Sequence, residues 1–290
     1  MSDLDWLTRL VEPPGEWRDA VVDTPTVATR EAITLLADCL GGPVPEHDVP
    51  PMWLAATSTW PALGSLGADG HPVAGLGYPP IPARQRMFAG GNLRVVSPTA
   101  VDRPLIRRSR VSDVQAKPGR TGPLVFVTVT HDYLNDAGPT GCQEAHQLVY
   151  RSGPPVANPA APGRPPVTPP PDDPAASIVL TPSPIALFRF SALTANSHRI
   201  HYDEAYATGV EGLPGVLVHG PLLAMLQLEL PRRLAPDRVV ASYAYRFRHP
   251  VASGSELVAS VVDEHPHHWL VAVRADGVVS VTGEIHFVSS

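Results

Sequence analysis

The chain has 290 residues, of which 43% are hydrophobic and 17% are charged, and its net charge is −6. This composition supplies the core of one large domain or two modest ones. Lys and Arg are scattered without a basic stripe, which argues against a nucleic-acid partner. No apolar run is long enough to span a bilayer, so we expect no membrane partner.

The two cysteines, Cys39 and Cys142, are too few for a disulfide framework, which favours a reducing compartment. The first residues are acidic and lack the basic and apolar regions of a signal peptide. We therefore expect a cytoplasmic protein.

The N-terminal half begins with an amphipathic helix over 29–40, with Thr29 as its N-cap. Residues 51–56 resemble the start of a second helix. Strands are then expected at 91–96, 105–117, 124–133 and 141–150. An arginine cluster near the second strand is interpreted as a solvated strand face or, at most, an anion site: Arg103, Arg107, Arg108 and Arg110.

Proline is the compositional outlier, with 35 residues, many of which lie between 154 and 184. Proline cannot continue a helix or donate a ladder hydrogen bond. We interpret 153–177 as a semi-rigid linker between an N-terminal domain, 1–152, and a C-terminal domain, 178–290. The alternative is a Pro-rich surface loop inside a single domain.

The C-terminal half opens with a short apolar run over 185–190. A helix is expected over 221–230, with Pro221 in its first turn and Pro231, Arg232 and Arg233 closing it. Strands follow at 238–247, 256–264, 268–275 and 278–287. Asp276-Gly277 between the last two is a hairpin signal.

The two halves follow one plan: a helical lead-in, a central helix and an antiparallel meander. A helix wrapped by a curled antiparallel sheet is the hot-dog arrangement, so the sequence predicts an α+β fold of two tandem hot-dog domains, a double hot-dog. The alternative is a single α+β domain with an incidental repeat.

Two motifs of the second half, 191–203 (SALTANSHRIHYD) and 218–222 (VHGPL), resemble the C-terminal half of fused MaoC-like hydratases. This group includes mesaconyl-CoA and itaconyl-CoA hydratases and the mitochondrial 3-hydroxyacyl-thioester dehydratase. In the first half, 86–91 (RMFAGG) and 119–128 (GRTGPLVFVT) resemble the N-terminal domain of the same group. The resemblance implies a hydratase or dehydratase whose partner is an acyl thioester of coenzyme A or of an acyl carrier. The first half has no histidine matching His201, which indicates a degenerate, non-catalytic copy.

The resemblance implies that His201 is the general base or acid, because imidazole titrates near neutral pH. Single-domain relatives carry an aspartate in the position of Asn196, and an amide cannot exchange a proton at neutral pH. Asn196 would therefore position water or the thioester, or act only as a turn residue. Which group assists His201 stays open.

Gly220 would donate its backbone N–H to the thioester oxygen, because it stands at a helix N-terminus where free N–H groups favour negative charge. The alternative is simple capping of the helix. Asp203 either orients His201 or caps the following segment, and His219 either packs in the core or has a direct role.

The other candidate substrate contacts are His198, Arg199, Arg84, Arg86 and Lys117. Arg84, Arg86 and Lys117 are candidates for binding phosphates or a distal carboxylate, since both are anionic. His198 and His201 lack a third ligand at metal-site spacing, so no metal is expected. No glycine-rich phosphate loop precedes a helix, so we expect no nucleotide cofactor.

Two other functions compete with the hydratase. Hot-dog thioesterases place a carboxylate early on the central helix, whereas the first acid here is Glu229. A non-catalytic acyl-thioester binder or accessory subunit is the other alternative.

Ala192 and Ala195 leave room beside Asn196, which favours a short or branched acyl group. A homo-oligomer is left open.

Overall fold

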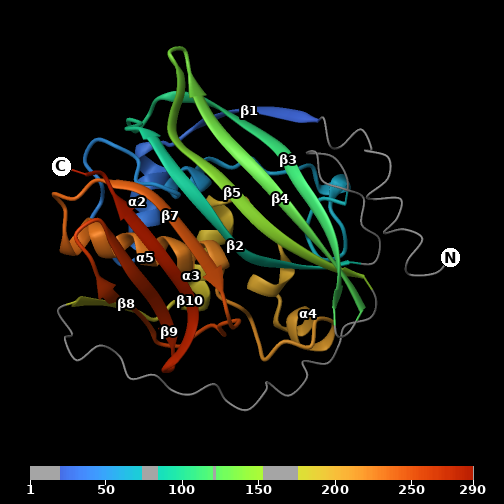
Figure 1. Cartoon of the computed structure of the whole chain (residues 1–290). Coiled ribbons are helices and arrows are strands. Elements are labelled where there is room, and N and C mark those ends of the chain that lie inside the picture. The colour runs from blue at the N-terminus through green and yellow to red at the C-terminus, as the bar shows by residue number, and fades with distance from the viewer. Residues whose placement is uncertain (1–19, 74–83, 120–121, 153–175, 290) are drawn as a thin grey trace.

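The computed structural model describes residues 20–73, 84–119, 122–152 and 176–289. The described strands form one ten-stranded sheet in the order β1-β3-β4-β5-β2-β7-β10-β9-β8-β6. Every neighbouring pair is antiparallel. Figure 1 shows this sheet curving around the helices of the second half.

The N-terminal half contains β1 (Val21–Val27), α2 (Arg30–Cys39) and two short 3₁₀ turns, η1 (Trp53–Thr57) and η2 (Leu63–Ser65). Its four long strands are β2 (Arg84–Ser97), β3 (Pro104–Gly119), β4 (Gly122–Asn135) and β5 (Gly138–Ser152). Thr29 caps α2 by accepting a hydrogen bond from Ala32 N–H, as its sequence position predicts. All four predicted strands are confirmed, and each is longer than its apolar run.

The C-terminal half contains β6 (Ser177–Leu180), α3 (Pro184–Leu193), η4 (Arg199–His201), α4 (Glu204–Gly209) and α5 (Gly220–Leu234). The strands β7 (Val240–Phe247), β8 (Leu257–Glu264), β9 (His268–Ala275) and β10 (Val278–Phe287) complete it. Asp276 and Gly277 both have positive φ, 49° and 80°, so the predicted hairpin turn between β9 and β10 is confirmed.

The same strand order occurs in both halves: β1-β3-β4-β5-β2 in the first and β6-β8-β9-β10-β7 in the second. The halves meet where β2 pairs with β7, from Gly90 opposite Arg246 to Arg94 opposite Ser242. The predicted double hot-dog is therefore confirmed. The five strands of each half are the two ends of one continuous ten-stranded sheet, so the halves do not form two separate sheets.

Four elements differ from the sequence prediction. The short edge strands β1 and β6 were not expected, because Pro25 and the prolines around β6 mask their weak patterns. The apolar run 185–190 forms part of α3, which Ser183 caps by accepting from Ala186 N–H and which Pro184 opens. The helix α5 continues through Pro231 to Leu234, because Pro231 lies in its last turns and Arg232 and Arg233 both bind the buried Glu229.

The second helix expected at 51–56 does not form. Met52 has a left-handed φ of 67°, and only the five-residue 3₁₀ turn η1 follows. Among its described residues the first half therefore has no counterpart of α5. A separate apolar cluster on β3, β4 and β5 packs against Phe88: Val111, Val114, Val125, Val127, Val129, Leu148 and Tyr150.

The predicted linker, 153–177, lies almost entirely outside the described residues, so the domain boundaries there stay a prediction. No helix among the described residues is long and apolar enough to cross a membrane. Beyond β2 and β7, the halves share one core that includes Leu36 of α2, Phe190 of α3 and Leu226 of α5.

Replacing Gly90 with Ala should destabilise the junction of the two halves. A Cβ at Gly90 would lie 2.4 Å from the carbonyl oxygen of Tyr245 on β7, and the backbone φ is 153°. We expect a loss of roughly 3 kcal/mol or more in the free energy of unfolding, measured by urea denaturation. Gly138→Ala is the control, because its φ is also positive but its Cβ would meet open space. Equal losses in the two variants would contradict the proposed clash at the junction.

Candidate active site

The motif 191–203 begins at the C-terminus of α3. Thr194 N–H bonds to Phe190 O, Asn196 N–H bonds to Ser191 O, and Ala195 between them has a left-handed φ of 49°. This arrangement is typical of helix C-termini, where glycine is the usual left-handed residue. It turns the chain sharply away from α3 and directs the following loop toward η4, which carries His201.

His201 is held by one hydrogen bond that fixes its tautomer. Its Nδ1 lies 2.9 Å from the carbonyl oxygen of Leu217. A carbonyl can only accept, so Nδ1 carries the hydrogen and Nε2 keeps its lone pair. The side chain is 8% exposed, and burial lowers its pKa to about 4, against the opposing effect of the Leu217 bond. His201 is therefore a neutral imidazole at pH 7 with Nε2 available as a base.

The segment 217–220 binds the motif loop on its other side. Leu217 N–H donates to Ile200 O at 2.8 Å, and the ring of His219 stacks on that of His201, with centroids 3.8 Å apart and an interplanar angle of 19°. His219 is fully buried, and its Nε2 lies 2.8 Å from Ser191 Oγ. Its pKa is lowered by burial and by His201 and His198. His219 thus supports the face of His201 and links it to α3.

Gly220 is the first residue of α5, directly after His219. Leu223 N–H already bonds to His219 O, whereas the N–H of Gly220 has no carbonyl of its own helix to bond. A Cβ at Gly220 would lie 3.0 Å from the ring of Phe247 and 3.1 Å from that of Phe88. The structure therefore places the first residue of α5 against two aromatic rings, one from each half.

Asn196 is a turn residue, which is one of the two roles that the sequence analysis gave it. Its Oδ1 accepts a hydrogen bond from His198 N–H at 3.1 Å. Because Oδ1 has this role, the Nδ2 hydrogens are the part of the amide that can serve a ligand.

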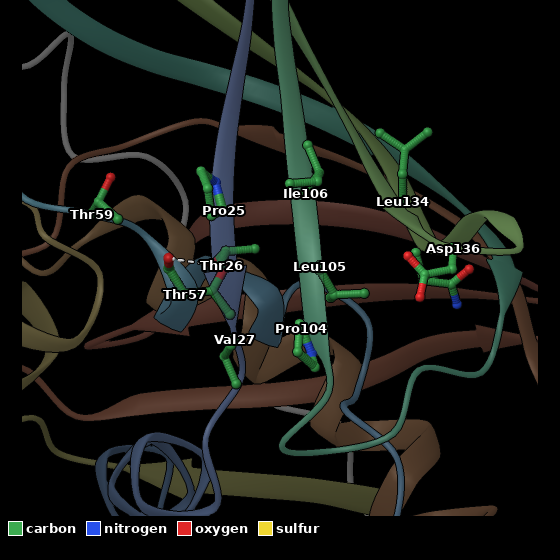
Figure 2. A pocket seen from close by; sticks show the side chains of 11 residues that line it. Pro25, Thr26, Val27, Thr57, Thr59, Pro104, Leu105, Ile106, Leu134 and Asp136 are labelled. Atoms are coloured by element: carbon green, nitrogen blue, oxygen red, sulfur yellow. Dashed lines mark hydrogen bonds between the residues drawn. The ribbon is translucent and has the colours of Figure 1, made fainter.

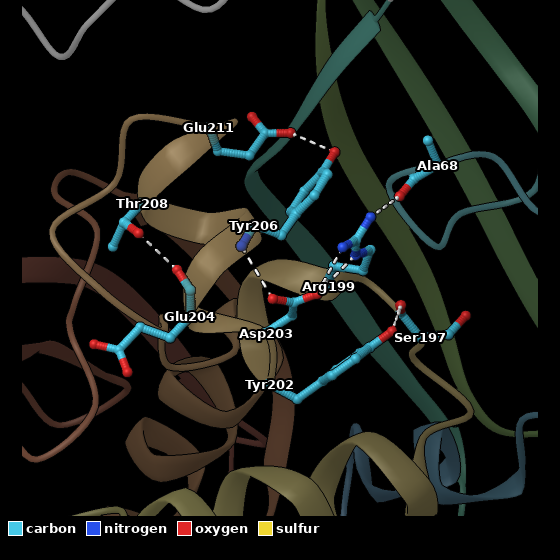
Figure 3. A network of polar contacts seen from close by, with 9 residues as sticks. All are labelled: Ala68, Ser197, Arg199, Tyr202, Asp203, Glu204, Tyr206, Thr208 and Glu211. Carbon is cyan, nitrogen blue, oxygen red and sulfur yellow. Dashed lines mark hydrogen bonds and ion pairs between the residues drawn. The ribbon is translucent and has the colours of Figure 1, made fainter.

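Asp203 and Arg199 form a polar network that does not include His201 (Figure 3). Asp203 caps α4 by accepting from Tyr206 N–H, and its other oxygen pairs with Arg199 Nη2 at 2.7 Å. These bonds lower the pKa of the Asp203 carboxyl. The guanidinium of Arg199 also lies 4.1 Å from the centre of the Tyr206 ring. Leu217 O, and not Asp203, orients His201.

A loop of the first half, 67–71, docks on the motif loop. Arg199 N–H donates to Asp69 O, Arg199 Nη1 donates to Ala68 O, and Ser197 Oγ donates to Gly70 O. The approach is so close that a Cβ at Gly70 would lie 1.9 Å from Ser197 O. Figure 3 shows the contact between Arg199 and Ala68. The motif loop is therefore held in part by the first half of the molecule.

His71 and Phe88 are site residues that the sequence reasoning missed. The ring of His71 lies 4.3 Å from that of His198, and Arg86 Nη1 lies 3.1 Å from His71 Nδ1. Both residues reach the motif only through tertiary contacts. The turn residues Asp69-Gly70 were a local signal for a loop, though not for its docking.

The remaining candidate cations differ in their positions. Arg86 lies on β2 beside the motif loop, whereas Lys117 lies on β3, three strands away in the sheet, with Nζ 4.9 Å from the centre of the Phe126 ring. Arg84 is the first residue of β2, and its side chain lies outside the described atoms. The structure thus brings Arg86, and not Lys117, to the motif.

A groove of about 530 Å³ lies elsewhere, between β1, β3 and the β4–β5 turn (Figure 2). Pro25, Leu105 and Asp136 are among its lining residues, and no predicted site residue is. In the part of the chain that the structure describes, no group of three or more His, Cys, Asp or Glu is arranged to hold a metal ion.

The chain is similar to known proteins over most of its length. Residues 53–253 match the family model described as hydroxyacyl-thioester dehydratase type 2. The chain is 37% identical over 254 residues to the mesaconyl-C(4)-CoA hydratase of Chloroflexus aurantiacus, which covers 87% of this chain and 86% of that protein.

Two solved structures from Mycobacterium tuberculosis are similar in fold. HtdX has a TM-score of 0.66 and 19% identity, covering 93% of this chain and 100% of that one. A conserved hypothetical protein with a double hot-dog fold has a TM-score of 0.54 and 16% identity, covering 93% and 96%. At these identities the two structures bear on the fold alone.

Because His201 is buried, we can predict how kcat/KM for hydration of an enoyl thioester depends on pH if this histidine is the base. A base acts in its neutral form, and burial lowers this pKa from 6.5 to about 4, so activity should be lost only as the pH falls through about 4. Between pH 6.5 and 4, His201 is protonated in the unfolded chain but still neutral in the folded protein. The free energy of unfolding should therefore also decline as the pH falls through this range. Circular dichroism at each pH separates the two effects. An acidic limb centred near pH 6.5 in folded protein would contradict a buried base.

Gly70→Ala should reduce kcat/KM, because the new Cβ must displace the carbonyl of Ser197 and shift the motif loop. A displacement of about 1 Å in a catalytic group can cost on the order of 10²-fold. The matched control is Gly254→Ala: its φ of 84° is close to the 86° of Gly70, but its Cβ meets open space. If both variants lost the same activity, docking of the loop would not matter to the site.

Proposed function

We propose that this chain, which belongs to the hydroxyacyl-thioester dehydratase type 2 family, catalyses the reversible addition of water to an enoyl thioester of coenzyme A. The observation that carries the proposal is the arrangement of His201 and Gly220. A buried imidazole, with its tautomer fixed by Leu217 O, is stacked on the residue that precedes a free helix-terminal N–H.

His201 Nε2 takes a proton from water as the oxygen attacks the β-carbon of the conjugated thioester. The resulting imidazolium then gives this proton to the α-carbon, and dehydration runs through the same steps in reverse. Asn196 cannot exchange a proton, so one residue both accepts and returns it. The Nδ2 group of Asn196 holds the water or the thioester in place.

The N–H of Gly220 stabilises the negative charge that develops on the thioester oxygen during the attack. The dipole of α5 adds to this stabilisation at the helix N-terminus. Phe88 and Phe247 lie against Gly220 and exclude water, which strengthens the hydrogen bond. The first half thus covers the site with an aromatic ring and donates no proton-transfer group.

The acyl group is short or branched in this proposal. The relative that is 37% identical is named for mesaconyl-C(4)-CoA, a branched acyl thioester that carries a second carboxylate. The small residues Ala192 and Ala195 lie beside Asn196 at the end of α3. They leave space for a substituent near the reacting carbons.

A thioesterase is the weaker alternative. Its carboxylate would be expected in the first turn of α5, which holds no acidic residue. Glu229 lies far along the helix, is 1% exposed and binds Arg232 and Arg233. These contacts give Glu229 a structural role.

His201→Gln should lower kcat for hydration of crotonyl-CoA by about 10²–10⁴-fold, because the variant lacks a titrating base. The loss of the conjugated thioester absorbance measures the rate. His267→Gln, an exposed histidine in the β8–β9 turn, is the control and should keep the wild-type rate. Wild-type turnover by a folded His201→Gln protein would exclude His201 as the base.

The length of the acyl group is tested with the wild-type protein. A higher kcat/KM for octenoyl-CoA than for crotonyl-CoA would contradict a short acyl group.

A further inference from the structure

The ring of His219 packs against two other rings in the core of the second half. The ring of Phe190 on α3 lies 4.8 Å away and is tilted by 53°. The ring of His201 lies 3.8 Å away and is nearly parallel, at 19°. His219 and Phe190 are both fully buried. One face of His201 is therefore covered by an aromatic ring that has no contact with solvent.

The hydrogen bonding of His219 keeps this ring neutral. Its Nε2 lies 2.8 Å from Ser191 Oγ, whereas its buried Nδ1 has no hydrogen-bond partner. An imidazolium carries two N–H donors, so protonation of His219 would leave a buried N–H at Nδ1 without an acceptor. Burial, then His201 and His198, lower the pKa of His219 well below 6.5. A proton that enters the stacked pair is therefore held by His201.

His201 has no carboxylate to stabilise its protonated form. Within the described residues, its hydrogen bond goes to the carbonyl oxygen of Leu217, and no acidic group contributes to its pKa shift. Asp203, which is close in sequence, pairs with Arg199 and caps α4. The proposed mechanism nevertheless forms an imidazolium at His201 when water gives up its proton. Another group must stabilise that charge.

The other titratable groups that face the pair are basic. The ring of His198 lies 5.6 Å from that of His201, nearly perpendicular to it. Behind His198 are His71, with ring centres 4.3 Å apart, and Arg86, which contacts His71. Basic groups oppose a positive charge on His201, so the stabilising contact is on the other side of the ring.

That side is the face of His219. The face of an aromatic ring carries partial negative charge, and it attracts a cation placed over it most strongly where water is excluded. A neutral His219 stacked on His201 meets both conditions, because the pair is buried and Nδ1 of His219 cannot carry a second proton.

We propose that the stacked face of His219 stabilises the imidazolium of His201 that forms when the base takes a proton from water. The inference rests on the hydratase function and adds a positioning residue to it. The proton moves from water to His201 Nε2 and then to the α-carbon of the substrate. His219 keeps its single ring hydrogen throughout and acts only through His201.

The test compares His219→Phe with His219→Leu. Both variants lose the bond to Ser191 and keep an apolar side chain, but only Phe keeps a ring face against His201. For hydration of crotonyl-CoA, kcat should be about 3- to 30-fold higher in His219→Phe than in His219→Leu. KM should be equal, because the imidazolium forms only after the substrate binds. Circular dichroism checks that both variants fold. Equal kcat values in the two folded variants would overturn the proposal.

An NMR titration separates the stacking effect from catalysis. In protein labelled with 15N-histidine, the His201 signal is the one that His201→Gln lacks. The pKa of His201 should be higher in His219→Phe than in His219→Leu, because the ring stabilises the protonated form. Equal pKa values, or the reverse order, would contradict the proposal.

The wild-type protein gives a second answer if neither variant folds. As the pH falls, His219 should keep the spectrum of a neutral ring while His201 gains its proton, and protonation of His219 first would overturn the proposal. The hydratase function fails separately: wild type that hydrates no enoyl-CoA, with the predicted order of pKa values intact, would contradict that function alone.

Discussion

The hydrogen bond from His201 Nδ1 to Leu217 O is the contact on which the candidate site depends. It fixes the tautomer, orients Nε2 and ties the motif loop to the segment that leads into α5. Leu217 N–H returns a bond to Ile200 O, so the two segments hold each other in register. Through His219, whose ring lies on that of His201, the same contact sets the position of Gly220 relative to His201. A backbone carbonyl thus has the orienting role that a carboxylate has in many catalytic histidine pairs.

The described residues of the first half contain no helix as long as α5, yet this half contributes to the candidate site. Its β2 strand pairs with β7 and brings Phe88 over Gly220, and its 67–71 loop binds the backbone of the motif at Ser197 and Arg199. A separate apolar cluster on its strands packs against Phe88. In the proposed mechanism the second half carries the base, His201, and the first half contributes Phe88 and the 67–71 loop.

Much of this arrangement follows from local sequence, and the rest depends on tertiary contacts. The hairpin at Asp276-Gly277, the Thr29 cap and the start of α5 at Gly220-Pro221 are set by neighbouring residues, so the sequence predicts them. The missing helix at 51–56 depends on the left-handed Met52, and the extension of α5 past Pro231 depends on Glu229 holding two arginines. His71 and Phe88 contact residues that are more than 100 positions later in the chain. The motif 86–91 marks Phe88 in the sequence, but neither residue's local sequence shows which distant residue it contacts. The absence of contact between Asp203 and His201 has the same origin, since the carboxylate is used by Arg199 and by the cap of α4.

The most direct measurement of the central claim is a crystal structure of the His201→Gln variant with crotonyl-CoA bound. The account predicts the thioester oxygen about 2.7–3.1 Å from Gly220 N, as for an oxyanion donor. The β-carbon should face the side chain at position 201, and the acyl end should lie between Phe88 and the loop that carries Asn196. An acyl group bound instead in the groove between β1 and β3, with Gly220 N–H directed at another acceptor, would contradict the account.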